Sequence, residues 1–255
     1  MARGGEEDGL AIRIAMWSGP RNLSTAMMRS FESRSDTTVS DEPFYGCFLK
    51  ATGADHPMRE EVIAAMDCDW RGVMASLRGP APGAAPIWYQ KHMWHHMTGP
   101  IGFDDFEGFT HAFLIREPER MIASYLKQRE VAEFNDFGLE RQAEFFDREA
   151  DRLGRAPPVI EAGDVLGDPE GVLTALCAAL GIPWDPAMLA WAPGRRDSDG
   201  PWAPHWYKSV EASTGFGPPD DDAIELPHEA RRLADRMMPH YKRLAAHRLG
   251  RRLSR

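Results

Sequence analysis

The chain has 255 residues, of which 43% are hydrophobic and 27% are charged. These proportions are typical of globular proteins and exclude a disordered, collagen-like or disulfide-scaffold chain. The length suits one large α/β domain, or at most two small ones. The 30 basic and 39 acidic residues give a net charge of −9, which disfavours a nucleic-acid partner because such binders are usually basic.

The cysteines and the N-terminus indicate the compartment. Cys47, Cys68 and Cys177 are odd in number, far apart and form no CxxC pair, which argues against a disulfide framework or a structural zinc site. Residues 1–9 have no apolar core, so we expect a loose tail rather than a signal peptide. No run of 18 apolar residues is free of charge, so we expect no membrane association. The sequence thus predicts a soluble, cytoplasmic protein and leaves its oligomeric state open.

Apolar, β-prone runs alternate with segments of helical composition. We expect strands at 10–17, 37–40, 87–91, 110–115 and 159–161, and helices at 23–31, 58–66, 70–77, 118–127, 139–153, 169–180 and 227–248. This alternation predicts a single α/β domain over residues 1–255, with three layers: a mainly parallel central sheet and helices on both faces. Such sheets bind ligands at the carboxyl ends of their strands, so the segments that follow the strands are the candidates for function.

The turn after the first expected strand has the composition of an anion-binding loop. A helix N-terminus presents unpaired backbone N–H groups that attract phosphate. Arg21 adds a positive charge, and Ser24 and Thr25 add hydroxyl donors. The turn lacks the second glycine and the lysine of GxxxxGK[ST], which disfavours a nucleoside triphosphate–Mg²⁺ site. A plain strand-to-helix turn with a capping serine is the alternative. The candidate residues are Ser18, Gly19, Pro20, Arg21, Asn22, Leu23, Ser24 and Thr25.

A second candidate anion site follows the fourth expected strand. Arg116 stands at the strand's end, and Ser124 lies about two turns into the helix that Pro118 opens. Arginine can hold an anion with its planar fork, and serine can add one hydrogen bond. A surface Arg–Glu pair is the alternative for this motif alone. Two anion sites on one sheet indicate a ligand with two separate phosphates.

These motifs resemble those of the sulfotransferases that use 3′-phosphoadenosine 5′-phosphosulfate (PAPS). The chain has PR-x-x-ST at the first site and R-x-P-x5-S at the second. A third stretch, 164–170 followed by 180–184, is similar to the family's late segment in which "DP" opens a helix that ends in "LG-x-P". The resemblance spans about residues 12–184 and implies a P-loop NTPase-like fold. It also implies the 5′-phosphosulfate at the first loop, the 3′-phosphate at Arg116 and Ser124, and no metal. Asn22-Leu23 replaces the family's usual Ser-Gly.

The resemblance also implies roles in the chemistry. Arg21 occupies the position of the family's catalytic cation, and Lys91 resembles a second lysine near the sulfate. Two residues compete for the role of general base: Glu42, which follows the second strand in DEPFY, and His92, which follows Lys91. His95 and His96 are further candidates for this role. The three histidines could alternatively be metal ligands, although no known zinc motif accompanies them.

Residues 197–219 are rich in Gly, Pro and Trp and are long for a loop without structure, and such loops are often functional. In the family that the chain resembles, a late loop folds over the nucleotide. This implies a lid whose Lys208, Ser213 and Thr214 would contact the 3′-phosphate. Aromatic side chains of 202–216 could cover the adenine or the acceptor. A structural loop anchored by its aromatic residues is the alternative.

The sequence therefore predicts a sulfotransferase that moves a sulfuryl group from PAPS to a hydroxyl or amine of a small-molecule acceptor. The transfer would proceed in line, with a general base and without metal. A P-loop-like kinase and a non-catalytic nucleotide-binding or interaction protein on the same scaffold are the alternatives. The acceptor is not specified by any motif.

Overall fold

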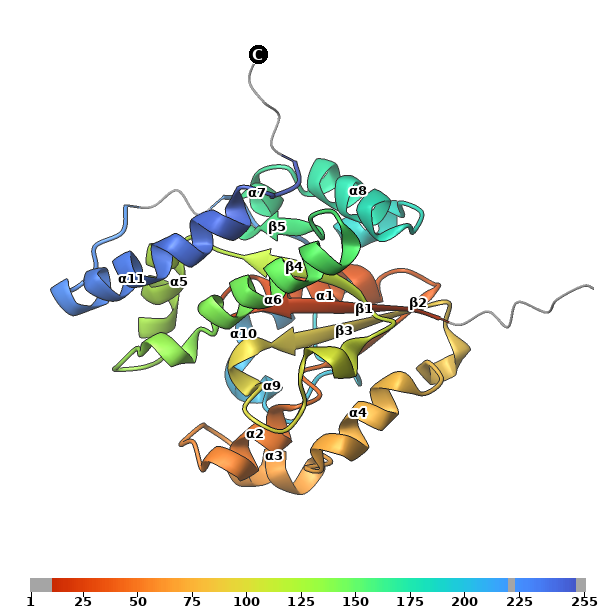
Figure 1. Cartoon of the computed structure of the whole chain (residues 1–255), viewed down its shortest axis with the longest axis horizontal. Helices are drawn as coiled ribbons and strands as arrows, with labels where there is room; N and C mark the ends of the chain where they lie inside the picture. The colour runs from red at the N-terminus through yellow and green to blue at the C-terminus, as the bar shows by residue number, and fades with distance from the viewer. Residues whose placement is uncertain (1–10, 220–222, 251–255) are drawn as a thin grey trace, which may run out of the picture.

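A single parallel sheet organises the chain (Figure 1). The computed structural model describes residues 11–219 and 223–250, so the expected tail at 1–9 lies outside the described residues. The strand order is β2-β3-β1-β4-β5. The strands are β1 (Ile12–Ser18), β2 (Thr37–Asp41), β3 (Ile87–Met93), β4 (Thr110–Ile115) and β5 (Val159–Glu161). The predicted fold class, a parallel α/β sheet between helices, is confirmed.

Most helices begin and end within a few residues of the predicted bounds. They are α1 (Ser24–Glu32), α2 (Tyr45–Thr52), α3 (Arg59–Ala65), α4 (Trp70–Arg78), α5 (Pro118–Leu126), α6 (Leu139–Leu153), α7 (Ala162–Gly167), α8 (Pro169–Leu180), α9 (Ala203–Trp206), α10 (Lys208–Glu211) and α11 (His228–Ala245). Helix α2 was not predicted, because glycine at position 46 lowers helix propensity. There a Cβ would lie 2.8 Å from the Met66 Cβ, so this glycine allows α2 to approach the end of α3 closely.

The two faces of β1 bury different parts of the core. Ile14 and Met16 pack in an apolar cluster with residues of α1 and α8. Ala15 and Trp17 point to the opposite face, into a cluster with residues of α4, α6 and α11. Successive side chains of a strand alternate between its faces, so the apolar run of β1 requires helices on both sides.

The third motif of the sequence is structural. The Asp168 side chain accepts a hydrogen bond from the Gly171 N–H and caps α8, and Pro169 is the first residue of that helix. Gly181 ends α8 with φ of 73°, the left-handed conformation that glycine adopts without strain. This confirms that "DP" opens a helix and that "LG" closes it.

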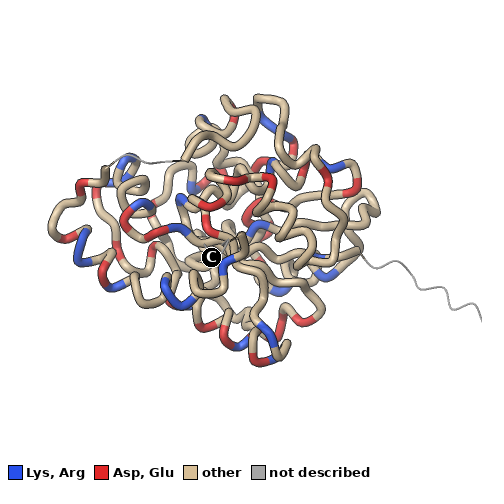
Figure 2. The backbone as a smooth tube through the Cα atoms, turned by 90° about the horizontal axis from the view of Figure 1, so that it is seen from above, with Lys and Arg blue, Asp and Glu red and all other residues tan. Residues whose placement is uncertain are grey.

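Charged residues of both signs occur along the described part of the chain. In the view of Figure 2, basic and acidic residues are interspersed along the chain. Within residues 11–219 and 223–250, no helix combines the length and apolarity needed to cross a membrane.

The strand order places the loop after β1 where the chain connections reverse their direction along the sheet. The connection that follows β1 leads to the β2 edge, whereas the connection that follows β3 crosses to β4 on the other side of β1. Ligands of such sheets bind where the direction of the connections reverses. The segments that follow β1, β2, β3 and β4 meet at this edge.

Candidate active site

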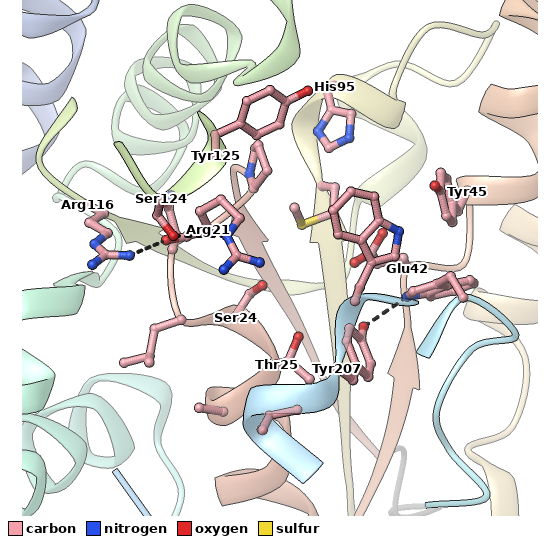
Figure 3. A pocket seen from close by; sticks show the side chains of 18 of the residues that line it. Arg21, Ser24, Thr25, Glu42, Tyr45, His95, Arg116, Ser124, Tyr125 and Tyr207 are labelled. Atoms are coloured by element: carbon pink, nitrogen blue, oxygen red, sulfur yellow. Dashed lines mark hydrogen bonds between the residues drawn. The ribbon is translucent and has the colours of Figure 1, made fainter. Parts of the chain in front are cut away.

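A cavity of about 520 Å³ lies at the carboxyl edge of the sheet (Figure 3). Its volume is within the range of small-molecule sites. One end, here called the cation end, is formed by residues 20–26 together with Arg116 and Ser124. The other end, here called the aromatic end, is lined by Glu42, Tyr45, Phe48, His56, His95, His96, Arg129, Trp202 and Trp206.

The loop after β1 holds an unusual backbone. Arg21 and Leu23 have φ of 63° and 70°, in the left-handed region that costs a non-glycine residue roughly 1–2 kcal/mol. Leu23 therefore keeps the backbone conformation that the family's glycine would adopt without strain. A Cβ on Gly19 would lie 2.7 Å from the Phe137 carbonyl oxygen, so this position also requires glycine.

The conformation of the loop after β1 orients the N-terminus of α1 toward the cavity. The first hydrogen bond of the helix runs from the Met27 N–H to the Leu23 carbonyl. The N–H groups of residues 24–26 consequently have no acceptor within the helix. All three residues line the cavity, so these N–H groups and the Ser24 and Thr25 hydroxyls are available to an anion. Ser18 and Asn22 are buried, at 0% and 1% exposure.

Two arginines converge at the cation end. The Arg116 guanidinium donates to the Arg21 carbonyl at 2.7 Å, and the Arg21 Nε donates to the Ser124 Oγ at 3.0 Å. Burial and the positive charge of Arg116 lower the pKa of Arg21. Two neighbouring cations repel each other unless an anion lies between them. The geometry thus brings Arg21, Arg116 and Ser124 together at one end of the cavity, as Figure 3 shows.

A buried charge cluster supports Glu42. The Lys91 Nζ donates to the Asp41 Oδ1 at 2.8 Å, to the Glu42 carboxylate and to the Tyr207 hydroxyl at 3.0 Å. Lys91 is 1% exposed and does not line the cavity, so it acts on the cavity through Glu42. The two carboxylates raise the pKa of Lys91 well above its ordinary value, so it stays charged.

Glu42 is a carboxylate of raised pKa in the cavity wall. Burial, and repulsion from Asp41, raise its pKa, while Lys91 opposes the shift. A raised pKa makes a carboxylate a better proton acceptor near neutral pH. Its φ of 43° places it in the strained left-handed region, as for Arg21 and Leu23. Such strain is concentrated at functional sites, and here three strained residues face one cavity.

The three candidate histidines lie in two places, with His92 apart from His95 and His96, whose ring centres are 4.1 Å from each other. His92 lies in the core, where its ring stacks on Trp17 at 4.6 Å and its Nε2 contacts the Gln90 Oε1 at 3.2 Å. His95 and His96 line the aromatic end, and the His96 Nδ1 lies 3.6 Å from the Glu42 Oε2. Burial lowers the pKa of His92 and of His95 to about 3, so these rings are neutral. Among the residues that the structure describes, no three His, Cys, Asp or Glu side chains gather as a metal-ligand set.

The segment 197–219 closes one wall of the cavity. It contains two short helices, α9 and α10, instead of the structureless loop that the sequence predicted. Trp206, Tyr207 and Phe216 line the cavity, whereas Lys208 and Thr214 are exposed and do not line it. The Ser213 hydroxyl lines the cavity but accepts from the Trp191 Nε1 at 3.0 Å and donates to the Val210 carbonyl at 2.8 Å.

Two buried contacts fix this segment, and sequence reasoning missed both. Arg29 of α1 forms an ion pair of 2.6 Å with Asp199, whose side chain is fully buried. The Tyr207 hydroxyl donates to the Asp41 Oδ2 at 2.7 Å and accepts from the Trp202 Nε1 at 3.0 Å. Asp41 is the last residue of β2. Its place directly after the β-prone run 37–40 was the only feature of the sequence that pointed to a role for Asp41 at this edge of the sheet.

The fold and the cavity define the chain as an α/β protein in which two arginines and a buried carboxylate face one cavity at the carboxyl edge of the sheet. A family model described as a sulfotransferase domain matches residues 12–248. The chain belongs to that family, which confirms the resemblance seen in its motifs.

The chain is also similar to two curated proteins and to solved structures. Two Arabidopsis thaliana proteins, named branched-chain-amino-acid aminotransferase-like protein 1 and 2, are 37% and 34% identical over 92% of this chain. The chain spans only 42% and 41% of their lengths. The sulfotransferase domain from the curacin biosynthetic pathway has a TM-score of 0.52 at 18% identity, covering 90% of this chain and 98% of that one. A sulfotransferase from Alicyclobacillus acidocaldarius has a TM-score of 0.51 at 16% identity, covering 93% and 96%. These two structures share the fold.

Proposed function

We propose that this protein is a sulfotransferase that uses PAPS and transfers its sulfuryl group to a hydroxyl or amine of a small molecule. One observation carries the proposal: a group of two arginines at a helix N-terminus faces the same cavity as a buried carboxylate of raised pKa. The first feature suits an anionic donor, and the second suits an acceptor that must lose a proton. Family membership supports sulfuryl transfer as the reaction.

In this proposal the two ends of the cavity have separate roles. The acceptor oxygen or nitrogen would attack sulfur, and the bond between sulfur and the bridging phosphate oxygen would break. Glu42 would take the acceptor's proton, and Lys91 would hold the Glu42 carboxylate in place. Arg21 and the N–H groups of α1 would stabilise the charge that grows on the leaving phosphate. No step in this scheme requires Lys208 or Thr214.

The second phosphate of the nucleotide is assigned to Arg116 and Ser124. We expect adenosine 3′,5′-bisphosphate to bind in the micromolar range without added metal, and adenosine 5′-monophosphate to bind more weakly. Arg116→Ala should weaken bisphosphate binding about ten- to hundredfold, because a charge-assisted hydrogen bond contributes about 1.5–3 kcal/mol. Isothermal calorimetry with both nucleotides measures this difference.

The monophosphate is the control for this measurement. Arg116 also donates to the Arg21 carbonyl, so its loss can loosen the loop. A loosened loop would weaken both nucleotides equally, and equal losses would place the 3′-phosphate elsewhere. Binding of ATP–Mg²⁺ in preference to the bisphosphate would favour the kinase alternative. Bisphosphate binding without sulfuryl transfer to any of a mixed panel of acceptors would favour the non-catalytic alternative.

A further inference from the structure

Arg129 places a positive charge at the aromatic end of the cavity. It lies three residues after the end of α5 and lines the cavity. One of its terminal nitrogens donates to the Asp55 carbonyl at 3.1 Å, and its guanidinium lies 5.6 Å from the centre of the Trp206 ring. Its Nε is buried and has no hydrogen-bond partner in the part of the chain that the structure describes. The guanidinium is thus held in position by a backbone oxygen and an aromatic ring.

Within residues 11–219 and 223–250, no carboxylate forms an ion pair with Arg129, and this includes Asp136 of the same cavity lining. Burial lowers the pKa of His56 to about 4 and of His95 to about 3, and the positive charge of Arg129 adds to both shifts. Both histidines are therefore neutral. Glu42 is already paired with Lys91.

Arg129 lines the cavity and forms no ion pair with a described carboxylate, so a ligand anion that accepts hydrogen bonds from its terminal nitrogens is favoured. A carboxylate fits best, because arginine presents parallel N–H groups that match the two oxygens of a carboxylate. The neighbouring wall is rich in aromatic rings. Tyr45 and Phe48 pack against the His96 ring at 4.4 and 5.0 Å, and the Trp206 ring lies beneath Arg129.

We propose that the acceptor is a small hydroxy- or amino-carboxylic acid with an apolar or aromatic body. Its carboxylate would bind Arg129, its body would pack against Tyr45, Phe48 and Trp206, and its reacting group would lie at Glu42. This inference rests on the proposed function, since it identifies the acceptor class of the same site. Arg129 is a specificity-determining residue in this assignment and has no part in the transfer itself.

The test compares two probes that differ only in charge. These are 3-(4-hydroxyphenyl)propanoate and 3-(4-hydroxyphenyl)propanamide, each titrated by calorimetry into the protein saturated with adenosine 3′,5′-bisphosphate. The native protein should bind the acid about ten- to hundredfold more tightly than the amide, the range expected for charge-assisted hydrogen bonds. In Arg129→Gln the preference should fall below about threefold while amide binding is retained, and Arg129→Lys should keep part of it.

Arg232→Gln is the matched control, because Arg232 lies on α11 with an exposed side chain and outside the cavity lining. It should keep the full preference for the acid. Equal binding of both probes by the native protein, or an unchanged preference in Arg129→Gln, would overturn the inference. The native comparison needs no variant, so misfolding of Arg129→Gln cannot hide the answer. The proposed function is judged separately, by transfer of labelled sulfate from PAPS. Transfer without a preference for acids would leave the function standing and reject the acceptor class.

Discussion

Glu42→Gln should lower kcat by about 10²–10⁴-fold, which is the usual contribution of a positioned general base. The substitution keeps the size of the side chain and removes its ability to accept a proton. Affinity for adenosine 3′,5′-bisphosphate should stay within about threefold, because Glu42 lies at the aromatic end and away from Arg21 and Arg116. Steady-state rates with PAPS and calorimetry on the same preparations give both quantities.

Three variants complete this experiment. Glu140→Gln changes a half-exposed carboxylate of α6 outside the cavity lining and should leave kcat unchanged. His92→Ala should lose some stability but retain most activity, because His92 stacks in the core on Trp17. His96→Gln tests the histidine that lies nearest to Glu42. Full activity in Glu42→Gln together with inactivity in His96→Gln would transfer the role of base to His96.

The raised pKa of Glu42 has a consequence for the pH profile. A base must be deprotonated to act, so kcat/KM should fall as the pH drops through the pKa of Glu42. Because burial raises this pKa above the ordinary value of 4.5, the acidic limb should have its midpoint above pH 4.5. The limb should disappear in Glu42→Gln. A limb that persists unchanged in this variant would belong to another group.

Lys91→Met should reduce the free energy of unfolding by about 3–5 kcal/mol, the usual cost of removing one partner from a buried ion pair. The substitution leaves Asp41 and Glu42 without their shared cation and removes a donor to the Tyr207 hydroxyl. It should also lower kcat, because Glu42 loses the contact that orients its carboxylate. Urea denaturation measures the stability, and PAPS turnover measures the activity.

Two comparisons separate lost charge pairing from lost packing. Lys242→Met removes an exposed lysine of α11 and should change stability by less than about 0.5 kcal/mol. Adding Asp41→Asn and Glu42→Gln to Lys91→Met should restore part of the stability, because the carboxylates that lost their partner are then neutral. No recovery in the triple variant would show that the cost came from packing and not from unpaired charge.

The candidate anion-binding loop at the cation end could be predicted from the sequence, because it is formed by consecutive residues. Residues 18–25 join a strand to a helix, and their residue types alone indicate an anion site. The left-handed backbone conformation of Leu23 could not be predicted, because leucine does not favour that conformation. The surrounding fold imposes it.

The sequence by itself determined the strands, their parallel arrangement and most helices. This was possible because hydrophobic periodicity, helix caps and helix-breaking residues are patterns of neighbouring residues. It also determined the candidate anion residues and the two competing bases. Only the tertiary structure separates those two candidates: β3 points His92 into the core, whereas the end of β2 turns Glu42 into the cavity. The contacts of Lys91, Asp41 and Tyr207, and the position of Arg129 over Trp206, join residues up to 166 positions apart. Such contacts leave no local pattern, because they arise only when separate strands and loops are packed against one another.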